Sequence, residues 1–228
     1  MHKYLLSAPL LALALGVPLA AHAHKAGDFI IRAGAATTAP NEESGNLKLD
    51  GTKVPGTKAT LDSDTQLGLA FAYMLTDHVG LELLAATPFQ HTVAVKGLGP
   101  GLDGKLADVK QLPPTLSLQY YPMDATSKFQ PYAGVGVNYT WFYDENLSSE
   151  RKGQGMNNLH IKNSWGWAGQ IGADYMLTDK IMLNAAVWYV DIDTQATLDG
   201  PSALGVGRTK VNVDVDPWVY MVGVGYKF

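Results

Sequence analysis

Histidine is the residue type in this chain best suited to acid–base or metal chemistry, since cysteine is absent. Beyond an apolar leader the histidines are His24, His78, His91 and His160. No Ser-His-carboxylate set can be assembled around any of them, so we expect no enzyme. His91 and His160 lie in different polar stretches. They leave metal binding as an open alternative, but scattered histidines are more often solvated, and we expect no cofactor and no metal.

In the segments that would position these side chains, the side-chain type alternates with a period of two residues, which indicates β-strands. Between residues 65 and 73 large apolar side chains alternate with small or polar ones. The large set is Leu67, Leu69, Phe71 and Tyr73, and the small or polar set is Gln66, Gly68, Ala70 and Ala72. Such a strand fits between lipid and a crowded lumen.

Eight segments carry this alternation, and the gaps between them are alternately short and long. The segments are 27–38, 64–75, 79–88, 112–121, 130–143, 163–176, 180–193 and 211–228. The sequence therefore predicts an all-β protein, an eight-stranded antiparallel transmembrane β-barrel with short periplasmic turns and long extracellular loops. A short helix is expected around residues 148–152 in one long loop.

The first residues are typical of a secretory signal. A basic start, an apolar run too short for a membrane span, and Ala21-His22-Ala23 predict a cleaved signal peptide over residues 1–23. Residues 24–228 then form the barrel, placed in the cell outer membrane as a multi-pass protein. The formal net charge of −4 and the lack of a basic patch argue against nucleic-acid binding.

The last segment ends on a face that carries Trp218, Tyr220, Tyr226 and the final residue Phe228. A terminal phenylalanine behind alternating apolar residues is similar to the signal read by the outer-membrane assembly machinery. We expect Tyr226 and Phe228 to serve as that signal. In a soluble sandwich the same strand would be an exposed, aggregation-prone edge.

With these segments in place, several stretches together resemble the OmpW family, in particular its pseudomonad branch. They are 24–29 (HKAGDF), 81–89 (LELLAATPF), 96–100 (KGLGP), 116–122 (LSLQYYP), 130–139 (QPYAGVGVNY) and 214–218 (DVDPW). The resemblance implies a narrow eight-stranded barrel with a hydrophobic lumen. It also implies passive uptake of small, mostly hydrophobic molecules, with sideways release into the membrane. Small amino acids remain an alternative solute class.

Inward and outward positions alternate along each strand, and the inward residues of such a barrel fall into two groups. The inward charged and polar residues are expected near the periplasmic ends of their strands, where they pair as a plug. They are Arg32, Glu82, Gln119, Asp174 and Lys227. Toward the outer side the inward face is expected to be a hydrophobic lumen, made by Ile30, Leu84, Ala86, Trp188, Val219 and Met221. Val213 and Val215 join it unless a bulge at Pro217 shifts the register. The plain alternative is that the charges only stabilise the barrel.

Pro88 lies near the end of its segment, where pairing would otherwise continue outward. Proline has no N–H and is disfavoured inside a sheet, so Thr87, Pro88 and Phe89 are the expected lateral gate. The alternative is that Pro88 merely ends the strand. The sequence therefore predicts a channel whose partners are outer-membrane lipids and small hydrophobic solutes. A structural or adhesive barrel, whose extracellular loops bind a host surface or phage, is the alternative function.

Overall fold

The computed structural model describes residues 23–228 apart from 42, 45, 50, 100–102 and 201–206. The expected signal peptide thus lies outside the described residues, except for its last residue, Ala23. Within the described part of the chain, no helix is long and apolar enough to cross a membrane.

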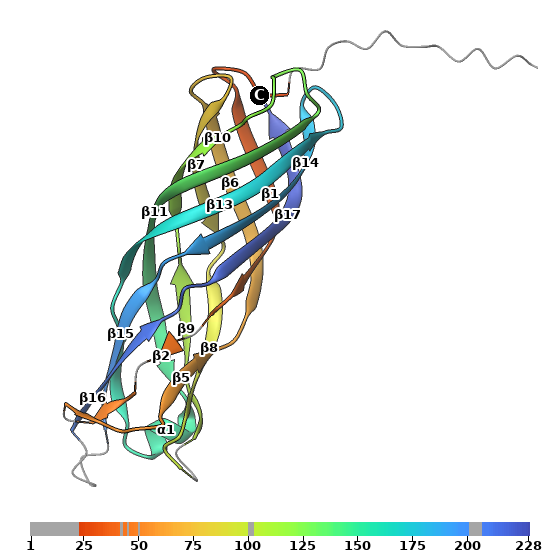
Figure 1. Cartoon of the computed structure of the whole chain (residues 1–228). Coiled ribbons are helices and arrows are strands. Elements are labelled where there is room, and N and C mark those ends of the chain that lie inside the picture. The colour runs from red at the N-terminus through yellow and green to blue at the C-terminus, as the bar shows by residue number, and fades with distance from the viewer. Residues whose placement is uncertain (1–22, 42, 45, 50, 100–102, 201–206) are drawn as a thin grey trace, which may run out of the picture.

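Eight strands of the described chain close into an antiparallel barrel whose strands run obliquely around it (Figure 1). In chain order they are β1 (Phe29–Ala39), β6 (Asp64–Met74), β7 (Val79–Ala86), β10 (Thr115–Tyr120), β11 (Phe129–Leu147), β13 (Ser164–Met176), β14 (Ile181–Val190) and β17 (Trp218–Lys227). Each pairs with its neighbours in sequence, and β17 returns to β1, with Ile30 opposite Lys227 and Ala39 opposite Trp218. The predicted fold class is confirmed.

Alternation along the strands explains the barrel's two faces. Even positions of β6, such as Ala70 and Ala72, are buried, whereas Leu67 is 51% exposed. Across the barrel the exposed large side chains include Leu83, Leu118, Val135, Ile171, Val222 and Val224. An apolar band on the outside, with backbone groups paired strand to strand, is what the hydrocarbon core of a bilayer requires.

Aromatic rings flank this band at both ends. One group includes Phe29, Tyr226 and Phe228, and the Tyr226 and Phe228 ring centroids are 4.7 Å apart. The other group includes the Tyr139–Trp165 pair, also with centroids 4.7 Å apart. Two aromatic girdles at the two interfaces are typical of transmembrane barrels. The short turns and the C-terminus lie at the first girdle, the periplasmic end, which is uppermost in Figure 1.

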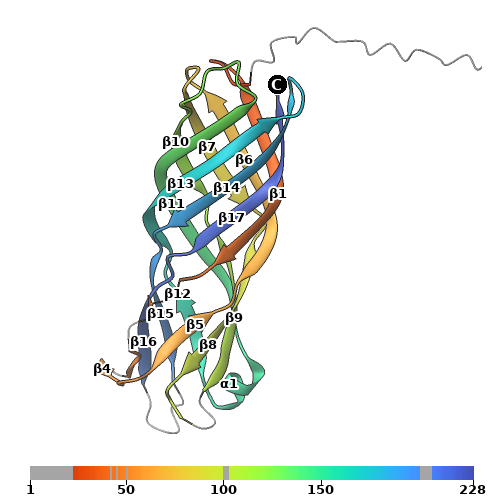
Figure 2. The ribbon, with the colours of Figure 1, turned by 45° about the vertical axis from the view of Figure 1, so that its right-hand side comes forward.

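Beyond the second girdle the barrel continues as two separate sheets, which lie on opposite sides of the molecule in Figures 1 and 2. One sheet consists of β5 (Lys58–Leu61), β8 (Phe89–Lys96), β9 (Gly104–Leu112) and the outer part of β11. The other consists of β2 (Glu43–Ser44), β3 (Lys48–Leu49), β4 (Thr52–Lys53), β12 (Asn157–Ile161), β15 (Asp193–Asp199) and β16 (Arg208–Asp214). We call this part the extracellular extension.

The extension corrects two expectations. Segments taken as loops contain paired strands, and the expected strand 211–228 is divided into β16 and β17 by Val215-Asp216-Pro217, where Asp216 has a φ of 36°. The break does not change parity, since Val213, Val215 and Val219 are all buried. The expected helix is present as α1 (Ser149–Gly153), with Ser148 as its N-cap.

Candidate functional site

A buried ion-pair cluster crosses the lumen near the periplasmic end. Arg32 Nη1 donates to Glu82 Oε2 at 2.8 Å, and Arg32 Nε donates to Asp174 Oδ1 at 3.0 Å. All three side chains are at most 1% exposed. They come from β1, β7 and β13, so the cluster ties together strands from around the wall. Buried charges are tolerated only when paired in this way.

Hydrogen bonds extend the cluster to side chains that the sequence reasoning missed. Arg32 Nη2 also donates to the hydroxyl of Tyr121 at 3.0 Å, and that hydroxyl donates to Gln119 Oε1 at 2.7 Å. Asn184 Nδ2 donates to Asp174 Oδ1 at 2.8 Å. Tyr121 follows directly after β10 and keeps the inward parity of Ser117 and Gln119, and Asn184 keeps that of Trp188, so strand parity was a signal that could have found both. We call these residues, with His24, the ion-pair cluster.

His24 is the third missed member. Its Nε2 lies 2.9 Å from Asp174 Oδ2, its ring meets that of Tyr121 edge-on, and it is fully buried. The segment before β1 therefore folds back into the periplasmic end of the lumen. A histidine next to a signal cleavage motif gave no sequence hint of this position.

Two residues do not lie where the sequence predicts: Lys227 has a different partner, and Ile30 lies at a different depth. Lys227 is buried, but its Nζ lies 3.5 Å from Asp28 Oδ2, below the ion-pair cluster rather than within it. Ile30 faces inward and is fully buried, yet it precedes Arg32 on β1, a strand that runs outward from the periplasmic end. The expectation that Ile30 lines the outer lumen is therefore wrong, because parity fixes the face of a residue and not its depth.

Above the cluster the remaining expected lumen residues fill the barrel. Trp188 and Met221 are 1% exposed and belong to the largest fully buried side chains. Trp188 lies four residues along β14 from Asn184, a member of the ion-pair cluster, and opposite Val219 on β17. In a barrel of eight strands the interior is normally filled by such side chains.

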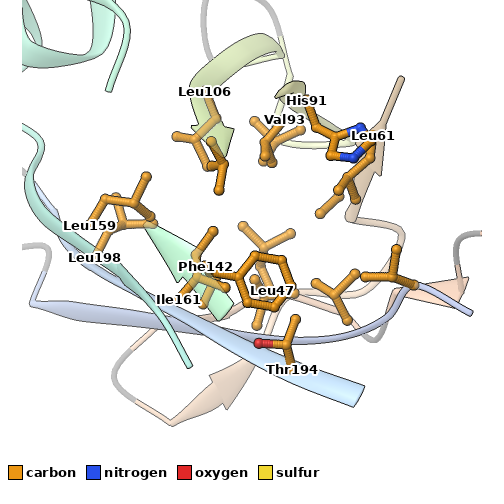
Figure 3. A pocket seen from close by; sticks show the side chains of 17 residues that line it. Leu47, Leu61, His91, Val93, Leu106, Phe142, Leu159, Ile161, Thr194 and Leu198 are labelled. Carbon is orange, nitrogen blue, oxygen red and sulfur yellow. The ribbon is translucent and has the colours of Figure 1, made fainter. Parts of the chain in front are cut away.

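The main apolar cavity lies farther out, between the two sheets of the extracellular extension (Figure 3). Its volume is about 40 Å³, and its lining comes from both sheets, for example Val93 and Phe142 on one side and Leu198 and Val213 on the other. Except for His91 and Thr194, every residue in its lining is apolar. None of the six expected lumen residues lines it, although Val213 and Val215, the two further candidates, do. Most of the other residues in its walls lie in strands of the extracellular extension that the sequence does not predict.

A second, smaller pocket of about 10 Å³ lies at the outer end of the membrane barrel. Leu84, Ala86 and Val219, three of the expected lumen residues, line it together with Ala85, Phe89, Gln111, Pro113, Thr115 and others. We call it the rim pocket. It stands between the barrel interior and the extension.

The wall beside the rim pocket is interrupted. β7 pairs with β10 as far as Leu84 opposite Thr115, and β8 pairs with β9 from Phe89 opposite Gln111. Ala85–Pro88 therefore face Leu112–Pro114 without a ladder pair between them, and the register changes by one residue across the gap. Pro88, Pro113 and Pro114 have no N–H to donate. We call these two stretches the proline break.

On its other edge the same chain segment pairs with β6 as far as Ala86 opposite Gly68, and beyond that point side chains replace part of the backbone pairing. The Thr87 N–H donates to the Leu67 carbonyl at 2.9 Å, but the Leu67 N–H donates to Thr87 Oγ1 at 3.2 Å. Farther out, the Gln90 N–H donates to Asp64 Oδ2 at 2.8 Å. Regular pairing resumes only with Leu61 opposite Val93. Thr87 and Pro88 thus have no ladder pair on either side, and pairing resumes on one side at Phe89, which lies opposite Gln111 on β9.

The two loop histidines are not brought together. His91 is buried, with Nδ1 bonded to the Asp62 carbonyl at 2.7 Å and Nε2 to Gln111 Nε2 at 2.9 Å. His160 has a side chain 69% exposed, 3.6 Å from Glu145. The alternative of a shared metal site is not supported by this arrangement.

A closed, tilted barrel with a lipid-facing apolar band between aromatic girdles defines an integral outer-membrane protein that crosses the membrane several times. The chain belongs to the OmpW family, whose model matches residues 25–228. It is 44% identical over 208 residues to outer membrane protein W of Vibrio cholerae, covering 90% of this chain and 91% of that protein. It is 45% identical over 210 residues to the Escherichia coli protein of the same name, covering 91% and 92%.

Solved structures agree with this assignment. The crystal structure of OprG from Pseudomonas aeruginosa is 64% identical and superposes with a TM-score of 0.88, over 91% of this chain and 98% of that one. The solid-state NMR structure of outer membrane protein AlkL in lipid bilayers is 25% identical, with a TM-score of 0.65 over 100% of this chain and 96% of that one.

Proposed function

We propose that this protein is a channel for passive uptake of small hydrophobic molecules, which enter from outside and leave sideways through the proline break. The observation that carries the proposal is the position of the rim pocket. It lies directly against the stretch of wall without ladder pairing, and above side chains that close the lumen.

The apolar cavity supports the choice of solute. Apolar molecules gain free energy when they leave water for such a lining, roughly 25 cal/mol for each Å² of apolar surface buried. The ion-pair cluster below opposes passage toward the periplasm, because an apolar solute would have to separate buried, paired charges. A solute in the rim pocket therefore has its easiest way out through the wall.

A relative's name agrees with this class of solute. One relative, 26% identical over 190 residues, is named as a dibenzothiophene metabolism operon protein of Pseudomonas aeruginosa. Dibenzothiophene is an apolar aromatic molecule. We take such molecules, together with alkanes, as the solutes to test first.

The proposal includes how the chain reaches its membrane. The signal peptide is removed after Ala23, and the assembly machinery reads Tyr226 and Phe228. Phe228 is 64% exposed and its N–H donates to the Phe29 carbonyl at 2.9 Å, so the terminal residue is part of the barrel wall with its ring on the outside.

The test is uptake by bacterial cells that lack their own OmpW-family protein and express this chain. We expect radiolabelled n-octane to enter faster than in cells with an empty vector, and labelled alanine to show no difference. Uptake of alanine alone would contradict the proposal and indicate a water-filled lumen. Uptake of neither would contradict it too, and would favour the adhesive barrel.

A further inference from the structure

The rim pocket contains two buried polar atoms without partners. Gln111 and Thr38 both line it and are each 1% exposed. Within the part of the chain that the structure describes, Gln111 Oε1 and Thr38 Oγ1 have no hydrogen-bond partner. Leaving such atoms buried and unpaired costs about 1–3 kcal/mol each, so a polar ligand atom is the natural complement.

The neighbouring histidine fixes which end of the Gln111 amide is available. The Gln111 Nε2 atom can only donate, so His91 Nε2 accepts that bond over 2.9 Å. The His91 Nδ1–H then donates to the Asp62 carbonyl at 2.7 Å. With its nitrogen engaged, the Gln111 side chain is left with an unused acceptor, Oε1.

The two free atoms have complementary abilities. The Gln111 Oε1 atom accepts only, whereas the Thr38 hydroxyl both donates and accepts. A ligand hydroxyl can therefore donate to Gln111 and accept from Thr38 at the same time. The pocket's volume of about 10 Å³ is that of a single water-sized group, which suits a hydroxyl and excludes a larger polar head.

The rest of the lining favours an apolar remainder, since its one other hydroxyl, that of Thr115, is already bonded to the Pro113 carbonyl and to Asn138. Leu84, Phe89, Val190 and Ile192 line the same pocket, and the larger apolar cavity lies beyond, with His91 in its lining and Gln111 bonded to that histidine. A chain attached to the hydroxyl would lie along this apolar surface. The proline break, with Ala85 and Pro113 in the pocket lining, stands beside the polar end.

We propose that Thr38 and Gln111 form a specificity subsite for the hydroxyl group of an aliphatic alcohol, so that the channel prefers such amphipathic solutes to hydrocarbons of equal size. This inference rests on the proposed function, because it names the solute class of the same path. The two side chains bind the hydroxyl end of the solute. They determine which solutes the channel prefers and do not take part in closing the barrel.

The test compares two competitors with the same number of heavy atoms, 1-octanol and n-nonane. Each is added to cells taking up labelled n-octane, and the concentration that halves the uptake is measured. Thr38→Val/Gln111→Leu is compared with the parent and with Gln195→Leu. Gln195 lies in the extension and bonds to Asn212, away from the rim pocket.

We expect the 1-octanol concentration to rise about tenfold in the double variant, the loss of two ordinary hydrogen bonds, while the n-nonane value stays within twofold. Gln195→Leu should match the parent. Unchanged values for 1-octanol would overturn the subsite and mean that a trapped water alone satisfies Thr38 and Gln111. If the parent takes up no n-octane, the proposed function fails and the subsite with it, whereas octane uptake in the double variant shows that it folds.

Discussion

The Asn138 side-chain Nδ2 donates to the Pro114 carbonyl at 3.2 Å, and the Asn138 side chain is fully buried. The same Nδ2 lies 3.2 Å from the Pro113 carbonyl. The carbonyl groups of one side of the proline break are thus satisfied from strand β11, and not by β7 across the gap. This contact lets the wall stay open there without leaving those acceptors unpaired.

Replacing Asn138 should therefore destabilise the barrel. In Asn138→Leu the Pro113 and Pro114 carbonyls each lose a buried donor but keep another, the Thr115 hydroxyl and the Tyr139 N–H respectively. The loss is therefore that of ordinary hydrogen bonds, about 0.5–1.5 kcal/mol each. The urea concentration at which half the protein unfolds, followed by the mobility shift of folded barrel on gels, should fall. Asn212→Leu, on an exposed edge of the extension, is the control and should leave it unchanged.

The stability of the barrel should depend on the charge balance of the ion-pair cluster more than on any single member of it. Arg32→Met leaves Glu82 and Asp174 buried without their cation, and such a loss costs about 3–5 kcal/mol. Adding Glu82→Gln and Asp174→Asn to Arg32→Met should recover most of that stability, measured by the same urea titration. A triple variant as unstable as Arg32→Met would mean that the charges are not the reason for the cluster.

The cluster also predicts a conductance effect. Glu82→Gln/Asp174→Asn removes both charges that hold Arg32, so single-channel conductance in planar bilayers should rise above the parent's. Unchanged conductance together with unchanged stability would show that these residues do not block the periplasmic half.

Closure of the barrel should depend on two glycines. Gly34 and Gly223 face each other where β1 meets β17, and a Cβ at Gly223 would lie 2.1 Å from the Ala33 carbonyl oxygen. Gly223→Ala should therefore sharply reduce the fraction of folded barrel in the outer membrane. Gly169→Ala is the matched control, since its Cβ would meet only a Trp167 ring carbon at 3.4 Å. Equal folding of both variants would contradict the close approach.

The barrel was predictable because lipid and a packed lumen impose opposite demands on alternate residues. That constraint placed Arg32, Glu82 and Asp174 on one inward face, where the structure brings them together. It carries no information on depth, so Ile30 was misplaced. It also weakens where the membrane ends, which is why most strands of the extracellular extension were not expected, although the alternation did extend to Val213 and Val215 in the wall of the larger cavity. His24 reaches the cluster from outside the strands, where periodicity has nothing to say, whereas Tyr121 continues the inward parity of β10 and could have been expected there.

Gln111 illustrates the other limit of sequence reasoning. Its unpaired Oε1 depends on His91 taking its amide nitrogen, and His91 in turn is oriented by the Asp62 carbonyl. These three residues lie in different strands or loops. No spacing in the sequence relates them.

The central claim, that solute leaves through the proline break, is tested most directly by Pro88→Ala. Alanine restores an N–H and relaxes the backbone, so the wall can pair across the gap. The initial rate of n-octane uptake should fall to that of cells with an empty vector, whereas Pro131→Ala, in a continuous part of β11, should keep the parent's rate. Uptake in a folded Pro88→Ala barrel that equals the parent's would contradict the lateral route.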